Sequence, residues 1–369
     1  MESSSHLPAL VAWLAFGLAF VFGAAAQRCN FCTMGAITDI ANFGEWRRMR
    51  MWLLAIAVAI LGAGALSASG QIDLSKSLYV SPNLIWLSHL VGGLLFGFGM
   101  TLASGCGSRT LIRMGAGNLK SLVVVVFLAL SAYMTLRGAL ALVRVNGFDA
   151  VKWNLGVAQD LPTLITSAGL AAPLAKWLVP ALVGIGLLAF IFKDAEFRAT
   201  REYVIGGIVI GVVIVGGWYV TGHIGHLLED PKTLEEAFVA TNSNRPESYS
   251  FTSPVAYLLE LLIFWTDQSK IMTFGVAGVL GMMVGATAMA VATKTFRWEG
   301  FASTEDLVNH IAGGLLMGFG GVVALGCTIG QGLTGISTLA IGSILTFFAM
   351  IGGCVAAVKY QEWRIERMA

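Results

Sequence analysis

The chain has 369 residues, of which 56% are hydrophobic and only 12% carry a charge. A soluble globular protein carries about 25% charged residues, so the composition excludes a soluble domain and predicts a protein surrounded mostly by lipid. The net charge of +2 gives no reason to expect binding to nucleic acid.

Nine apolar segments are each long enough to cross a bilayer as a helix of about 20 residues. In chain order they are Leu7–Ala26, Met51–Ser69, Leu84–Ala103, Leu119–Val143, Pro173–Phe192, Tyr203–Thr221, Phe274–Thr293, Leu307–Leu325 and Thr338–Val358. Backbone inside hydrocarbon must satisfy its own hydrogen bonds, so we predict an all-α polytopic membrane protein with about nine transmembrane helices. Met1–His6 contains no Lys or Arg, and the first segment is therefore interpreted as a helix rather than a signal peptide.

Basic residues in the connections indicate the orientation. Fifteen of the 23 Lys and Arg residues fall in five connections that share one face of a nine-span chain. Cytoplasmic loops carry an excess of such residues. We therefore expect a bacterial inner-membrane protein with a periplasmic N-terminus and a cytoplasmic C-terminus.

Two passages match without a gap, which indicates an internal duplication. His89–Gly107 reads HLVGGLLFGFGMTLASGCG and His310–Thr328 reads HIAGGLLMGFGGVVALGCT; eleven of nineteen positions are identical at an offset of 221 residues. The copies lie in the third and eighth predicted spans, so they run in opposite directions. Inverted repeats are a recurrent transporter architecture with the site where the halves meet. We predict one membrane domain with a first half, 1–200, and an inverted second half, 201–369.

Each copy ends at a cysteine that is followed by a stretch prone to breaking a helix. These stretches read GSRTLIRMGAG after Cys106 and TIGQGLTG after Cys327, and glycine permits the unwound turns that end a half-helix. We expect a short re-entrant half-helix in each copy. Its free N–H groups and positive dipole end would face the site and favour an anion.

Five cysteines are candidates for chemistry or for packing. Cys106 and Cys327 are repeat mates, and because a polarizable thiol suits a sulfur-containing ligand, we assign both to a substrate site. We assign the residues beside them to the same substrate site: Gly105, Gly107, Gly326 and Thr328. In the CxxC of Cys29 and Cys32, we expect Cys32 to line the pathway and leave Cys29 open, since no second CxxC completes a metal site. Cys354 lies in an apolar run without polar neighbours and is predicted to pack in the core.

Four polar residues remain as candidates. His89 and His310 are paired by the repeat, and we favour hydrogen bonds between helices over a functional role for both. Arg109 either marks the cytoplasmic edge or, if the break after Cys106 is re-entrant, draws an anion inward. Gln331 occupies the position of Thr110 in the first copy and is a predicted polar contact for the anion.

At these residues the sequence resembles the YeeE/YedE family of bacterial inner-membrane proteins. The matching features are Phe31–Cys32, Gly92–Leu111, PESYSFTSP at Pro246–Pro254 and Gly326–Gly335. The chain departs from the family pattern at Gln331, where many relatives are expected to have His, and at Gly107–Arg109.

The resemblance implies an hourglass-shaped inverted repeat whose short helices point to the waist. It also implies three essential cysteines, which by motif fall on Cys32, Cys106 and Cys327. Thiosulfate would pass between their thiols through S–H···S contacts without large domain motions. A TusA-like sulfur carrier protein of the YeeD/TsuB type would be the cytoplasmic partner, and no cofactor or metal is implied.

We therefore predict a transporter, not an enzyme, that imports thiosulfate. A selenium compound or another sulfur species is the alternative substrate within the same family. A soft-metal permease is a weaker alternative, because its Met or His ligands would cluster with the cysteines, whereas the 14 Met residues are scattered. A membrane thiol oxidoreductase would need a cofactor motif, and we see none in the sequence.

Overall fold

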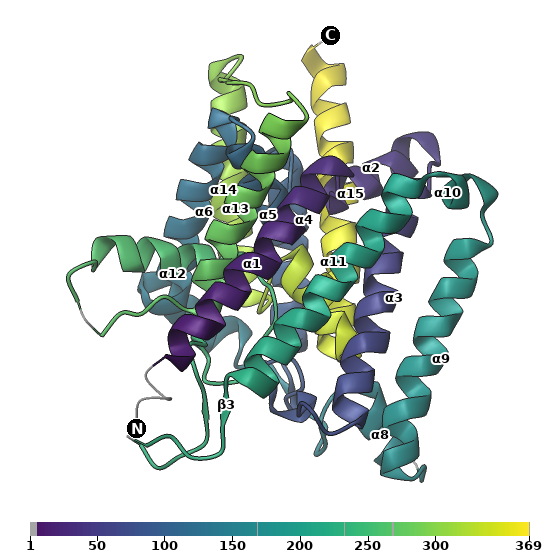
Figure 1. Cartoon of the computed structure of the whole chain (residues 1–369). Helices are drawn as coiled ribbons and strands as arrows, with labels where there is room; N and C mark the ends of the chain where they lie inside the picture. Colours follow the sequence, from purple (N-terminus) through teal and green to yellow (C-terminus); the bar gives the residue numbers. More distant parts are fainter. Residues whose placement is uncertain (1–5, 168, 232, 268, 369) are drawn as a thin grey trace.

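A computed structural model describes residues 6–167, 169–231, 233–267 and 269–368 (Figure 1). Within these residues nine helices are long and apolar enough to cross a membrane, which confirms the predicted all-α polytopic fold. The long helices are α1 (Leu7–Arg28), α3 (Arg47–Ala68), α4 (Trp86–Leu102), α6 (Leu119–Arg137), α9 (Ala172–Phe192), α11 (Arg201–Tyr219), α13 (Phe274–Ala292), α14 (Thr304–Val323) and α15 (Ile341–Met368).

Shorter elements connect or interrupt the long helices. They are α2 (Thr33–Phe43), α5 (Gly107–Gly115), α7 (Ala139–Val143), α8 (Leu161–Ser167), α10 (Ala195–Ala199), α12 (Thr252–Ile263), η1 (Leu74–Lys76), η2 (Arg144–Phe148), η3 (Val220–Ile224) and η4 (Gly330–Gly335). Two antiparallel strand pairs complete the connections: β1 (Asn83–Leu84) with β2 (Trp153–Asn154), and β3 (His226–Leu227) with β4 (Ala237–Phe238).

The element order is the same on both sides of α9. The series from α1 to α6 consists of one long helix, one short helix, two long helices, one short helix and one long helix. The same series recurs as α11, α12, α13, α14, η4 and α15. The packing exchanges partners between the two sets: α1 packs on α13 as α11 packs on α3, and α4 packs on α15 as α14 packs on α6. α4 and α14 also pack on each other. The division of the chain at residue 200 stays a prediction.

Ion pairs gather the five basic connections at one end of the bundle, here called the basic face. Arg28 pairs with Glu202 at 2.7 Å, Lys120 with Asp306 at 2.8 Å and Arg364 with Glu305 at 2.8 Å, and Arg50 pairs with Asp194. The opposite end, here called the loop face, holds connections 69–85, 144–160 and 225–251. Figure 1 shows the chain beginning at the loop face and ending beyond the basic face.

Two glycines at equivalent positions of the repeat let the helices approach closely. A Cβ on Gly97 of α4 would collide with the carbonyl of Met350 in α15, and a Cβ on Gly318 of α14 would collide with the carbonyl of Leu128 in α6. Small residues serve this purpose at helix contacts in membranes, where burial of apolar surface gives no driving force. The glycines of the two matching passages therefore hold α4 and α14 against their neighbours.

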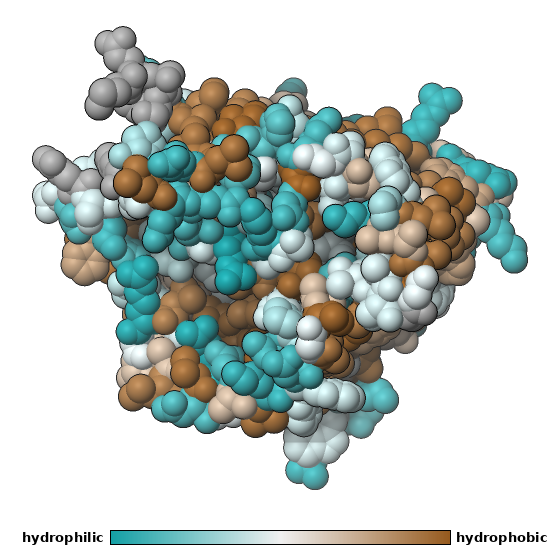
Figure 2. Space-filling model, turned by 90° about the horizontal axis from the view of Figure 1, so that it is seen from below, coloured by the Kyte–Doolittle hydropathy of each residue, from teal (hydrophilic) through white to brown (hydrophobic). Residues whose placement is uncertain are grey.

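The surface agrees with a membrane setting. Apolar side chains of α9, such as Leu182 at 63% and Ile185 at 60% exposure, face outward, and α9 lies at the edge of the bundle (Figure 1). Seen from the loop face, hydrophilic residues form bands on either side of a hollow with a hydrophobic floor (Figure 2). This hollow is the visible entrance on the loop face.

Labelling from the two sides of the membrane tests the orientation. In Asn242→Cys, a thiol in the loop-face connection before α12 should react with an impermeant maleimide in intact cells, because we place that face outside. In Glu366→Cys, a thiol near the C-terminus should react only after permeabilisation. The native thiols give little background, since all five are buried.

The reverse labelling pattern would overturn the orientation. Labelling of both positions from one side would overturn the odd number of crossings.

Candidate functional site

The same turn precedes each of the three cysteines assigned to the pathway. Two residues before Cys32, Cys106 and Cys327 stands a residue other than glycine with positive φ: Asn30 at 51°, Ser104 at 56° and Leu325 at 60°. The next residue donates its N–H to the carbonyl five positions back, at 3.0, 2.8 and 2.7 Å respectively, as in a Schellman helix ending. A left-handed conformation costs an ordinary residue about 1–2 kcal/mol, whereas Asn adopts it readily, so the fold holds strain at Ser104 and Leu325.

Each turn places its cysteine at the N-terminus of a short helix. Cys32 is the N-cap of α2 and Cys106 is the N-cap of α5, while Cys327 directly precedes the short helix 328–337 that contains η4. The sulfurs of Cys32 and Cys327 each accept the third N–H of their helix at 3.4 Å. Because helix N-termini attract negative charge, the thiols lie where an anion is stabilised.

A fourth short helix, α12, begins at the same place. Its N-cap Phe251 donates its backbone N–H to Cys327 Sγ at 3.4 Å, and Ser250 Oγ lies 4.0 Å from that sulfur. Cys106 lies within electrostatic range of both Cys32 and Cys327. The N-termini of four short helices are thus brought together, with Cys106 near both of the other thiols.

Hydroxyl groups accompany the thiols. Thr33, Thr252 and Thr328 are the first residues of their short helices, are at most 1% exposed, and have hydroxyls without a hydrogen-bond partner among the described residues. In α5 the first residue is Gly107, and the hydroxyl near the thiol is that of the second residue, Ser108, 3.3 Å from Cys106 Sγ. A buried unsatisfied hydroxyl costs about 1–3 kcal/mol, and the oxygens of a bound anion would remove that cost.

Two arginines lie on the basic-face side of the thiols. Arg109 donates from Nη2 to Asn30 at 3.0 Å, while its Nη1 is buried without a partner among the described residues. Arg48 pairs with Asp39 at 3.3 Å. Both arginines act electrostatically on Cys32. Of the two roles predicted for Arg109, attraction of an anion therefore fits its position.

A cavity of about 220 Å³ opens on the loop-face side of Cys327. Its polar lining includes Tyr79, Arg144, Glu247, Ser248, Ser250 and Tyr257. Burial raises the pKa of the Glu247 carboxyl to about 7, although Ser243 donates a hydrogen bond to it at 3.1 Å. The carboxyl therefore changes charge near neutral pH, inside the cavity through which an anion would reach Cys327.

A second cavity of about 280 Å³ adjoins this one. It shares Leu78 and Leu325 with the first cavity and adds Lys152 and Arg245. Leu325 is the left-handed residue of the Cys327 turn, so both cavities reach the same turn. Their cationic side chains would attract an anion to the loop face.

An aromatic stack closes one side of the site. Trp52 lies between Phe31 and Phe347, with ring centroids 5.5 and 5.2 Å apart and planes within 14° of parallel. A Cβ on Gly332 would lie 2.7 Å from the Trp52 ring. The stack therefore joins the residue before Cys32 to the short helix after Cys327.

The other predicted site residues mostly shape the turns. Gln331 is buried and donates from Nε2 to the Ala324 carbonyl at 2.5 Å, so this donor is engaged by backbone, and its Oε1 has no partner among the described residues. A Cβ on Gly105 would lie 3.3 Å from Arg109, and one on Gly326 would lie 3.2 Å from Gln331. Gly107 has more room, with Leu128 at 3.5 Å.

The two repeat histidines differ in their partners. His89 Nδ1 lies 2.7 Å from Thr346 Oγ1, which joins α4 to α15 as predicted. The same prediction is wrong for His310, whose Nδ1 lies 2.7 Å from the carbonyl and 3.0 Å from the carboxylate of Asp306 in its own helix. Neither ring is at a helix N-terminus of the site.

The two remaining cysteines, Cys29 and Cys354, do not lie at the N-terminus of a short helix. Cys29 is the C-cap of α1 and packs beside Gly206 of α11. Cys354 accepts a hydrogen bond from Thr101 at 3.2 Å, so the prediction that it has no polar neighbour is wrong. The partner lies in α4 and the bond supports the contact of α4 with α15.

Sequence reasoning named Thr328 as a site residue but missed α12 and the hydroxyls of Thr33 and Thr252. The signal for Thr33 was present, because it directly follows the candidate Cys32. Thr252 carries no such mark, since the residue before it is Phe251. Only the shared element order shows that α12 is the counterpart of α2 in the second half of the chain.

Comparison with known proteins gives the family. The family model described as "Sulphur transport" matches residues 28–356. The thiosulfate transporter TsuA of Escherichia coli (strain K12) is 26% identical over 333 residues, which cover 85% of this chain and 84% of the relative. The thiosulfate transporter TsuA of Spirochaeta thermophila is 26% identical over 356 residues, 94% of this chain and 98% of the relative. The probable transporter YedE of Salmonella typhimurium is 28% identical over 118 residues, 31% of this chain and 27% of the relative.

The family match spans the turns before all three pathway cysteines and all four short helices. It confirms the resemblance to YeeE/YedE proteins that the Gly-Cys motifs indicated. The chain therefore belongs to the sulphur transport family.

Proposed function

We propose that this protein carries thiosulfate across the bacterial inner membrane into the cytoplasm. The observation that carries the proposal is the set of three thiols at the N-termini of short helices, two of them accepting helix N–H groups. The names of two relatives that align over most of the chain support the substrate. Thiosulfate has a polarizable terminal sulfur, which suits a thiol, and oxygens, which suit N–H and O–H donors.

The positions of the thiols suggest the order of contacts. Ser250, whose Oγ lies 4.0 Å from Cys327 Sγ, lines the loop-face cavity. Cys106 interacts electrostatically with both other thiols, and Cys32 interacts with Arg48 and Arg109. The terminal sulfur would accept an S–H hydrogen bond from Cys327, then Cys106, then Cys32, with no covalent bond formed. Several weak sites in series favour passage, because an ion held strongly at one site would not leave.

The basic face is the proposed exit. There Arg48 and Arg109 would receive the anion from Cys32. A TusA-like sulfur carrier protein is the partner that the family resemblance implies at this face. Phe43, 81% exposed at the end of α2, would be available to such a partner.

Replacement of the three thiols tests the relay. Cys32→Ser, Cys106→Ser and Cys327→Ser should each lower thiosulfate uptake at least about tenfold, equivalent to about 1.4 kcal/mol, because a hydroxyl is less polarizable than a thiol. Cys354→Ser should transport normally, since Cys354 only supports a helix contact. Uptake of labelled thiosulfate is measured at matched membrane levels. Wild-type uptake by the Cys106 and Cys327 variants would show that both residues serve only in packing.

Replacement of the unpaired hydroxyls tests the contact with oxygen. Thr33→Val and Thr328→Val keep the side-chain shape but remove a donor to the anion, so the KM for thiosulfate should rise about ten- to hundredfold, the equivalent of about 1.5–3 kcal/mol. The matching serine variants should retain most of the affinity. Thr135→Val is the control, because Thr135 is also buried but donates to Ser131 in its own helix at 2.7 Å. An unchanged KM in both site variants would exclude these hydroxyls from binding.

The Glu247 carboxyl predicts a pH dependence. Its pKa is raised to about 7, so the carboxyl is mostly neutral at pH 6 and mostly negative at pH 8, where it repels an entering anion. Uptake should therefore fall as the outside pH rises through 7. Glu247→Gln should remove this fall and keep the pH 6 rate.

The phenols that line the same cavity do not titrate there. Tyr79 and Tyr257 stay neutral, because burial raises the pKa of both above the usual value near 10. A Glu247→Gln variant with the wild-type pH profile would show that another group is responsible.

A further inference from the structure

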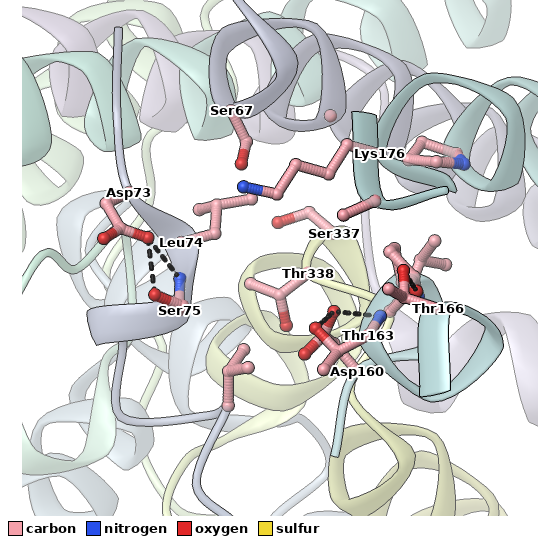
Figure 3. Close-up of a pocket in the computed structure, with 16 residues that line it drawn as sticks. Ser67, Asp73, Leu74, Ser75, Asp160, Thr163, Thr166, Lys176, Ser337 and Thr338 are labelled. Carbon is pink, nitrogen blue, oxygen red and sulfur yellow. Dashed lines mark hydrogen bonds between the residues drawn. The ribbon is translucent and has the colours of Figure 1, made fainter. Parts of the chain in front are cut away.

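A cavity of about 180 Å³, lined by several polar side chains, lies at the far end of the short helix that begins after Cys327 (Figure 3). The last residues of this helix and its following turn, Ser337 and Thr338, line it together with Asp160 before α8. Backbone contacts fix this arrangement: Leu161 donates its N–H to the Leu339 carbonyl at 3.1 Å. The cavity is separate from the thiols and unexplained by the proposed relay.

Asp160 holds a free carboxylate oxygen in this cavity. The residue is 8% exposed; its Oδ2 accepts both the N–H and the hydroxyl of Thr163, at 3.0 and 2.9 Å. Its Oδ1 is buried without a hydrogen-bond partner among the described residues. Figure 3 shows Asp160, Thr163 and Thr338 together on one side of the cavity. A buried carboxylate oxygen without a partner is costly unless a cation or donor meets it.

The remaining charges leave the cavity able to take one positive ion. Asp73 is occupied by the N–H and hydroxyl of Ser75, at 3.1 and 2.6 Å. The Lys176 side chain reaches across the cavity toward Ser67, away from Asp160 (Figure 3). Two carboxylates against one ammonium leave a net charge of −1. Divalent ions usually take several carboxylates, so this donor set suits a monovalent cation.

We propose that Asp160 and the end of the helix 328–337 form a sodium site that couples to anion uptake. The hydroxyl of Thr338 and the carboxylate of Asp160 would supply oxygen ligands, and the C-terminal end of a half-helix favours a cation. The anion would bind at the N-terminal end of the same helix, about 15 Å away at 1.5 Å per residue. Opposite charges at the two ends would stabilise each other through the helix and its dipole.

The sodium site rests on the proposed function and adds a source of energy, which the thiol relay by itself lacks. Moving a dianion into a cytoplasm that is electrically negative is uphill, and a relay of thiols provides no energy. Sodium entering from the loop face, where we place the outside, would supply part of this energy, because one Na⁺ moving with each dianion halves the net charge that enters and adds the energy of the Na⁺ gradient. Ser337 ties the helix end to α11, because it accepts a hydrogen bond from Trp218 Nε1 at 2.9 Å.

Proteoliposomes containing the full chain separate the two proposals. Thiosulfate uptake against its gradient should be at least about tenfold faster with an inward Na⁺ gradient than with choline, and thiosulfate should stimulate ²²Na⁺ entry. Asp160→Asn, which keeps the hydrogen bonds to Thr163, should lose both effects but still exchange labelled for unlabelled thiosulfate. Asp267→Asn is the control: Asp267 accepts the N–H of Ser269 at 2.9 Å and does not line the cavity, so this variant should behave as wild type.

Each other outcome has a defined meaning. Wild-type exchange of thiosulfate without any Na⁺ dependence would overturn the sodium site and leave the proposed function intact. Full Na⁺ dependence in Asp160→Asn would also overturn the site. Absence of thiosulfate exchange in the wild-type protein would overturn both proposals.

Discussion

An anion inside a bilayer must be stabilised without bulk water, and the rest of this structure depends on how that constraint is met. At Cys327 helix N–H groups of Gly330 and Phe251 meet the sulfur, and no lysine ammonium is among its contacts in the part of the chain that the structure describes. Partial charges of about half a unit and thiols bind an ion less strongly than a full counter-charge does. The full charges of Arg48 and Arg109 lie on the basic-face side, beside Cys32. A site built this way stabilises an ion that also has to leave.

Helix ends inside a membrane create their own difficulty, because interrupted helices expose backbone groups that lipid cannot satisfy. The chain meets this with three Schellman turns at non-glycine residues. The strain at Ser104 and Leu325 is offset because each turn closes one helix and starts the next within a few residues. Close glycine contacts such as that of Gly97 with Met350 supply part of the packing that holds the turns.

The sequence alone was enough for the nine spans, since a long apolar segment has one stable form in lipid. The gapless match from His89 and His310 also predicted the helix breaks at Cys106 and Cys327. The fourth short helix was not predictable in this way. Between Pro246 and Ile263 the second half has a short helix like α2, but its amino-acid sequence does not match. Phe251 is therefore the N-cap of α12, where Cys32 is the N-cap of α2.

Partners of single side chains were harder to predict. Periodicity places His310 on a helix face, but whether its ring meets another helix or Asp306 four residues earlier depends on packing distances. The same applies to Cys354, whose partner Thr101 is 253 residues away in sequence. The unpaired oxygens of Thr252 and Asp160 could be found only once the neighbours of each residue were known.

The helix α9 has a consequence for how the protein inserts. Among the described residues, four full-length helices precede α9 and four follow α10. Four crossings bring a chain back to the side where it started, so two such sets joined directly would insert in the same orientation. α9 adds one crossing and reverses the second set relative to the first. Because of this one lipid-facing helix, two similar sets of helices are inserted in opposite orientations in the membrane.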